Sequence, residues 1–256
     1  MPDYELNVVK TLEYKRPEID KGYADQTLSV DIANRAVAIN PVEPKTREVF
    51  VGGKGYDLWL LWNAVEPTTR WNDPANAICI ASGPLGGTPN YPGSGKSIVT
   101  SLSPLTGSVI DSNVGGYFGP YLKFSGFAAL QIQGKAAQDT VIYIDGIDGR
   151  VQILEADGLP DNAYELSDLL TGHFAGGKPR SISVVSAGPG ARNTLMGCLN
   201  FTWYDAKRKR ARYKQAGRGG IGTVFAHKGI KALVVRWDTV TVDTNKPADK
   251  DRLKVV

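Results

Sequence analysis

Glycine is the feature that most restricts what this chain can fold into. The 256 residues include 29 glycines, about 11% against a usual level of roughly 7%. They gather in residues 83–127 and 215–229, and many of the 15 prolines lie among them. Glycine has no Cβ, so it permits tight turns and lets the backbone approach another group closely. The sequence therefore predicts several tight turns at which main chain lies against a neighbour or a ligand.

The composition sets the class of protein. Its 42% hydrophobic and 22% charged residues indicate a globular chain of one large domain or two small ones. Thirty Lys and Arg against 26 Asp and Glu give a net charge of +4, too mild to indicate nucleic-acid binding. The charged N-terminus lacks the apolar core of a signal peptide, and no apolar run reaches the roughly 20 residues of a membrane span. We expect a cytoplasmic protein with no membrane span.

Two cysteines, Cys79 and Cys198, lie in separate apolar stretches. This placement favours buried free thiols over a disulfide. There is no CxxC motif and no Cys/His cluster, so the sequence provides no zinc or iron–sulfur site of its own.

The pattern along the chain predicts an α+β fold. Residues 1–24 are polar and are expected to form an irregular N-terminal extension, and 239–256 a polar C-terminal tail that resembles a linker. Between them we expect strands near 28–32, 36–39, 77–82, 97–103 and 180–189, a hairpin after 129 with its turn at 145–149, and helices opening near Tyr56 and over 163–174. Residues 103–127 are expected to be a loop that ends in a short helix.

An internal repeat is visible at a spacing of 103 or 104 residues. Gly115-Gly116 and Gly219-Gly220 are each followed by a helix-sized span, a single glycine and an Ala-Leu pair. The repeat predicts two related Gly-Gly turns that face a common centre, although two unrelated turns would give the same letters.

Three glycine loops stand out, at residues 93–96, 113–116 and 214–220, and the first and third contain cations. Backbone N–H groups of such loops bind anions, and a Lys or Arg strengthens the contact with phosphate. The first loop is not a P-loop, because Asn90 stands where the motif needs glycine, and GRGGIG at 217–222 does not stand in the right place for a dinucleotide-binding GxGxxG motif. A polyphosphate or pterin-type ligand and plain structural turns both remain open at this point.

These motifs resemble the N-terminal domain of the aldehyde:ferredoxin oxidoreductase family of tungsten enzymes, which includes the catalytic subunit of class II benzoyl-CoA reductase. The similar stretches are GGKGYDLWLLW (52–62), GPLGGTPNYPGSGK (83–96), SPLTGS (103–108), NVGGYFGPYLKFSGF (113–127) and AGRGGIGTVFAHKGIKALVV (216–235). They follow the family's order over residues 28–237. The resemblance implies two β-sheets related by a pseudo-twofold axis, with short flanking helices, that form a tungsten-bis-pyranopterin-binding domain over 25–238.

The resemblance also implies the residues that bind the cofactor. They are Lys96, Asn113, Gly115, Gly116, Lys214, Gln215, Gly217, Arg218 and Gly219. In the family, backbone carbonyls matching those of Asn113 and Gln215 bind a magnesium ion that bridges the two pterin phosphates. No catalytic residue is identified.

This sequence departs from the family in several places. Lys96 and Lys214 replace arginines, which keeps the charge but loses bidentate phosphate binding. Residues 207–214, KRKRARYK, look like an inserted basic stretch, either a solvated loop or a site for cofactor phosphates, an acyl-CoA phosphate or an acidic subunit.

The cysteines that bind the family's [4Fe–4S] cluster lie in C-terminal domains that have no counterpart here. We therefore expect a split tungsten or molybdenum oxidoreductase, acting on an aldehyde or an aryl acyl-CoA, with a cluster-bearing partner chain and a ferredoxin-type electron carrier. The alternative is a truncated member of the family. The competing hypotheses are a noncatalytic scaffold that has lost the cofactor, and a nucleic-acid-binding protein, for which no motif is present.

Overall fold

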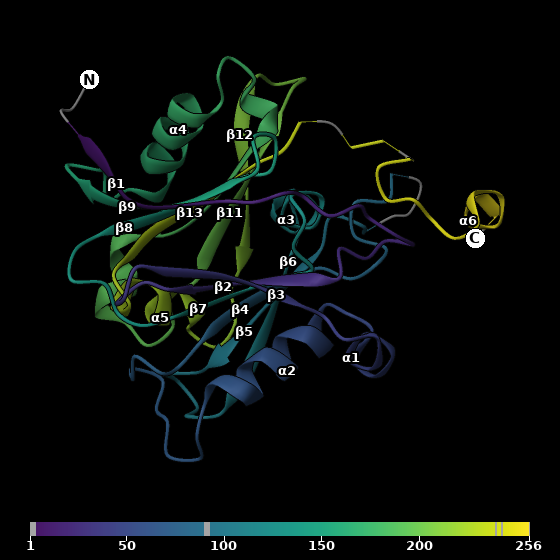
Figure 1. Cartoon of the computed structure of the whole chain (residues 1–256). Coiled ribbons are helices and arrows are strands. Elements are labelled where there is room, and N and C mark those ends of the chain that lie inside the picture. The colour runs from purple at the N-terminus through teal and green to yellow at the C-terminus, as the bar shows by residue number, and fades with distance from the viewer. Residues whose placement is uncertain (1–3, 90–92, 239, 242, 256) are drawn as a thin grey trace.

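Two mixed β-sheets frame the computed structural model, which describes residues 4–89, 93–238, 240–241 and 243–255 (Figure 1). The six-stranded sheet has the order β3-β2-β7-β4-β5-β6, built from β2 (Gln26–Asp31), β3 (Ala36–Pro41), β4 (Ile78–Ala81), β5 (Ser97–Leu102), β6 (Val109–Val114) and β7 (Ala129–Gln133). The seven-stranded sheet has the order β1-β9-β8-β13-β10-β11-β12, built from β1 (Glu5–Glu13), β8 (Thr140–Asp145), β9 (Arg150–Asp157), β10 (Ile182–Ala187), β11 (Leu199–Asp205), β12 (Arg210–Ala216) and β13 (Ile230–Arg236).

The helices complete a layered arrangement. They are α1 (Pro44–Phe50), α2 (Lys54–Ala64), α3 (Phe118–Phe124), α4 (Ala163–Phe174), α5 (Ile221–His227) and α6 (Lys250–Val255). Figure 1 shows α3 and α5 between the two sheets, with α4 and α2 on the outer faces. The central layer buries the largest apolar cluster, which includes Phe118, Phe201 and Phe225. Apolar burial on both faces of each sheet explains the continuous apolar runs in the sequence.

The two sheets repeat one topology, as the Gly-Gly spacing predicts. Strands β3-β2-β7-β4-β5-β6 correspond in order to β9-β8-β13-β10-β11-β12, and each has a single parallel pair, β2 with β7 and β8 with β13. Helices α3 and α5 occupy the same place in the repeat, each ahead of a positive-φ glycine, Gly126 and Gly229. The α+β fold with two related sheets is thus confirmed.

The structure corrects the prediction for the N-terminus. Residues Glu5–Glu13 form β1, which pairs antiparallel with β9 at the edge of the larger sheet. Its side chains are mostly exposed, so its sequence has no clear apolar alternation, and pairing with β9 decides its conformation.

Two further strands differ from the sequence-based expectation. Strand β6 lies inside the span predicted as a loop, and β7 does not join the β8–β9 hairpin but pairs with β2 and β4 of the other sheet. The basic stretch is a hairpin turn followed by β12, and the C-terminal tail contains α6. The hairpin turn at 145–149 and the helices α2 and α4 are confirmed.

A substitution in the first turn of α5 tests how tightly this helix is packed. A Cβ added to Gly222 would lie 2.3 Å from the carbonyl oxygen of Cys198, so we expect Gly222→Ala to lower the free energy of unfolding by about 1–3 kcal/mol. Gly172 of α4 is the matched control, because a Cβ there meets no atom within 4 Å, and Gly172→Ala should raise stability by up to about 1 kcal/mol. Urea unfolding measures both, and equal effects of the two substitutions would contradict this packing.

Candidate functional site

The two sheets meet at edge strands β6 and β12, which are in contact. The Arg218 N–H donates to Ser112 Oγ over 3.2 Å, and the Ser103 hydroxyl donates to the carbonyl of Gly219 over 2.7 Å. A Cβ added to Gly219 would lie 2.3 Å from the Ile110 side chain, so the turn fits only as glycine. These contacts hold the second Gly-Gly turn directly against the strand that leads into the first.

Asn113 and Gln215 occupy matching positions in the repeat. Each is the last residue but one of its strand, Asn113 opposite Ile98 in β5 and Gln215 opposite Asn200 in β11. Both are exposed, and the Gln215 amide donates to Asn200 Oδ1 over 3.3 Å. The structure therefore places the two residues expected to bind magnesium at equivalent points of two adjoining edge strands.

Three cations surround these turns. Lys96, Lys214 and Arg218 are exposed, and none of them forms an ion pair with a residue that the structure describes. Lys96 directly follows Gly95, whose added Cβ would lie 2.7 Å from the carbonyl oxygen of Gly116. The loop that contains Lys96 thus lies against the first Gly-Gly turn.

The surface between the turns is open. A Cβ added to Gly115 would meet only Lys214 Cγ, at 3.8 Å, and one added to Gly217 meets nothing within 4 Å. Unpaired cations beside open glycine backbone form a surface that suits an anion with several phosphate oxygens. The nine residues expected to bind the cofactor lie in three segments that the fold brings together.

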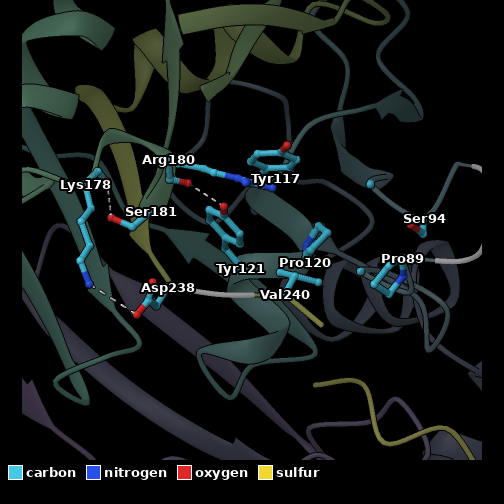
Figure 2. Close-up of a pocket in the computed structure, with 12 residues that line it drawn as sticks. Pro89, Ser94, Tyr117, Pro120, Tyr121, Lys178, Arg180, Ser181, Asp238 and Val240 are labelled. Atoms are coloured by element: carbon cyan, nitrogen blue, oxygen red, sulfur yellow. Dashed lines mark hydrogen bonds and ion pairs between the residues drawn. The ribbon is translucent and has the colours of Figure 1, made fainter. Parts of the chain in front are cut away.

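A cavity of about 620 Å³ opens beside Tyr117, the residue after the first Gly-Gly turn (Figure 2). Tyr121 forms part of its wall, and its hydroxyl donates to the carbonyl of Arg180 over 2.7 Å. The Arg180 side chain extends along the cavity toward Tyr117 and forms no ion pair with a described residue (Figure 2). The volume is that of a small-ligand site.

Lys123 of α3 fixes the base of the first glycine loop. Its ammonium donates to the carbonyl of Pro84 over 3.0 Å and to Asn245 Oδ1, and the Asn245 amide donates to the same carbonyl over 2.8 Å. Burial away from water lowers the pKa of Lys123 to about 7. A buried ammonium held by uncharged acceptors thus anchors the loop that ends at Lys96.

No cluster of three or more His, Cys, Asp or Glu side chains suited to a metal ion occurs in the described part of the chain. Cys79 is a buried free thiol, as the sequence predicts, whereas the free thiol of Cys198 is only half-buried. A metal ion that requires three such side chains would therefore need ligands from outside the described residues.

Comparison with known proteins decides the family. A family model described as "Aldehyde ferredoxin oxidoreductase, N-terminal domain" matches residues 27–237. This chain belongs to that family. A tungsten-containing aldehyde ferredoxin oxidoreductase of Pyrococcus horikoshii is 30% identical over 215 residues, which are 84% of this chain and 33% of the relative.

Two further relatives of this family member have different names. The aliphatic sulfonate oxidoreductase, WOR-like subunit, of Pyrococcus furiosus is 27% identical and matches 91% of this chain and 37% of its own length. A chain of the active site complex BamBC of benzoyl coenzyme A reductase, in complex with 1,5-dienoyl-CoA, superposes with a TM-score of 0.74 at 28% identity, covering 84% of this chain and 31% of that one. This chain thus spans about a third of the length of these relatives.

All three names describe an oxidoreductase or a reductase. Tungsten is named for the relative from Pyrococcus horikoshii, and a subunit or a complex is named for the other two. In the described residues no helix combines the length and apolarity that crossing a membrane requires.

The sequence did not indicate every residue that borders the site. Tyr117 and Arg180 both line the cavity but come from distant parts of the chain, and no motif links them. The sequence could have indicated only Tyr117, which directly follows Gly115-Gly116. A side chain next to a turn that faces a ligand lies beside that ligand's site.

The pKa of Lys123 has a consequence for stability. Between about pH 7 and its ordinary pKa of 10.5 the unfolded chain holds the proton that the folded chain has lost, so stability should rise with pH in this window. The Lys123→Met variant has no titrating group at this position, so its free energy of unfolding should lack this part of the increase with pH. Urea unfolding at pH 7, 8, 9 and 10 measures the difference. Parallel stability curves for the two proteins would contradict the role of burial at this lysine.

Proposed function

We propose that this chain binds a tungsten-bis-pyranopterin cofactor between its two Gly-Gly turns, as the cofactor base of a tungsten-dependent oxidoreductase. The observation that supports the proposal is the junction of β6 and β12, where two equivalent turns and three unpaired cations border one open surface. The membership of the chain in the tungsten enzymes' domain family supports it independently.

The residues present fit this cofactor. Lys96 on one side and Lys214 with Arg218 on the other would bind the two pterin phosphates, each from its own half of the repeat. The backbone carbonyls of Asn113 and Gln215 would bind the magnesium ion that bridges those phosphates, and edge strands leave part of their backbone without a strand partner. The open backbone at Gly115 and Gly217 leaves room for the ligand.

When bound, such a cofactor supplies two-electron chemistry at a metal held by its own dithiolene sulfurs. This agrees with the absence of a protein metal cluster from the described residues. The chain itself neutralises phosphate charge and fixes the orientation of both pterins through rigid strands. Lysine at positions 96 and 214 provides a positive charge but lacks the planar guanidinium with which arginine binds phosphate through two hydrogen bonds. Backbone groups would therefore determine more of the orientation of the cofactor.

A [4Fe–4S] cluster would have to come from outside this region, because two cysteines cannot supply four thiolates. We propose that a cluster-bearing partner chain provides it and passes single electrons to a carrier such as ferredoxin. The substrate is proposed to be an aldehyde/carboxylate pair, with an aryl acyl-CoA as the alternative.

Loss of two phosphate-binding side chains tests cofactor binding. Lys96→Ala combined with Arg218→Ala should lower the pterin and tungsten content per chain at least tenfold, since contacts to charged groups are worth about 1.5–3 kcal/mol each. Lys45→Ala, at an exposed lysine of α1 with no ion pair to a described residue, is the control and should keep the full content. Unchanged pterin in the double variant would favour the noncatalytic scaffold.

Elemental analysis tests the enzyme class directly. The protein, purified without oxygen together with any chain that copurifies, should contain tungsten or molybdenum, two pterins per metal, and magnesium. A preparation that contains neither tungsten nor molybdenum would end the proposal.

A further inference from the structure

Strand β3 forms one edge of the six-stranded sheet, at the opposite end of the strand order from β6 and the candidate site. Within the described residues its strand partner is β2 alone. The N–H of Val42, directly after β3, donates to the carbonyl of Asp25 over 2.9 Å, and hydrogen-bonded pairs alternate along an antiparallel ladder. The backbone groups of Ala38 therefore face β2, whereas those of Val37 and Ile39 point outward from the edge.

The repeat gives this edge a counterpart, because the β2–β3 and β8–β9 hairpins match. In each hairpin the aspartate that ends the first strand accepts two N–H groups of the turn. The strand registers then place Val37 at the position of Val151, and Ile39 at the position of Ile153. The outward-facing edge of β3 thus corresponds to the outward-facing edge of β9.

Strand β1 covers that edge of β9. Residues of β1 lie opposite both Val151 and Ile153 in an antiparallel ladder. Val151 and Ile153 are 0% and 1% exposed, whereas Val37 and Ile39 are only half-buried at the open edge. The fold itself therefore shows that this position in the repeat accepts an antiparallel strand.

The edge of β3 lacks the features that keep sheet edges from pairing, which are charged side chains, bulges and proline. The other edge strands of the two described sheets, β1, β6 and β12, each contain charged side chains. Strand β3 has the sequence AVAINP, which contains no charge, and its register with β2 has no bulge. Its proline, Pro41, is the last residue, so residues 36–40 present an unprotected edge.

We propose that a second copy of this chain pairs with β3, in an antiparallel β3–β3 contact whose twofold axis passes beside Ala38. In that register Val37 of one copy lies opposite Ile39 of the other, and both residues turn their backbone groups toward the partner strand. Opposite residues share a face, so the two Val–Ile pairs extend the apolar layer against which these side chains already pack. Ala38 meets only Ala38.

The edge favours a second copy over a different protein because its sequence is complementary to itself, as a twofold contact requires. It also offers no charge by which another chain would be selected. In the paired form β6 of each copy lies at an outer end of one continuous sheet, so both candidate sites stay open. The inference goes beyond the proposed function, since pairing at β3 requires no cofactor.

Sedimentation equilibrium of the protein, purified with any chain that copurifies, measures this self-association. Ala38 is exposed, and Ala38→Lys places two lysines against each other at the axis. Because like charges oppose each other across an interface, the dissociation constant of the dimer should rise at least tenfold. Asn7→Lys adds the same charge at an exposed position of β1 and should change it less than twofold.

A disulfide tests the register independently of added charge. Cα atoms of a non-hydrogen-bonded pair lie about 4.5 Å apart, which a disulfide can span, so Ala38→Cys should form a covalent dimer under mild oxidation. Ala36→Cys, on the same exposed face, would lie opposite Asn40 and should not cross-link. The unchanged protein, which keeps Cys79 and Cys198, gives the background.

The proposal is overturned if the protein does not self-associate, if Ala38→Lys self-associates as tightly as the unchanged protein, or if Ala36→Cys cross-links as readily as Ala38→Cys. Loss of a copurifying chain from Ala38→Lys, with self-association unchanged, would assign the edge to that chain and also overturn it. Pterin and tungsten content should be equal in the unchanged protein and in Ala38→Lys. Their absence from both would contradict the cofactor proposal alone.

Discussion

The contact between edge strands β6 and β12 is the constraint on which the rest of the site depends. Each strand ends a sheet, and each leads into a glycine turn, so their contact brings both turns to one surface. Two hydrogen bonds across the junction, from Ser103 to Gly219 and from Arg218 to Ser112, fix its register. Without them the glycines would be separate turns, and their cations would be scattered surface charges.

The repeat explains why this contact can serve a paired ligand. Two copies of one topology place equivalent backbone groups, at Asn113 and Gln215, on the two sides of the junction. A ligand with two similar halves then meets the same type of contact twice. The halves differ beyond the turns, since the basic strand β12 and Trp203 of β11 belong to the second half.

Much of the core was readable from the sequence. Strands β2 and β3, helices α2 and α4 and the β8–β9 turn have clear periodicity or turn residues, and the family motifs identified the glycine segments and their cations. Strand β1 and strand β12 were not readable, because both are edge strands with exposed side chains and few apolar positions. Their conformation comes from hydrogen bonds to β9 and β11, which lie far along the chain or depend on an unusual turn.

The sequence by itself determined that the chain has two glycine-rich units, what charge accompanies them, and that no CxxC motif or Cys/His cluster comes with them. Those properties reside in residue types and local spacing. Only the tertiary structure decided that the units face each other, that Lys214 lies beside Gly115, and that a basic stretch is an ordered strand with its arginines on one face. These are distances between segments about a hundred residues apart, and they are set by sheet pairing and by packing around α3 and α5, which no local pattern specifies.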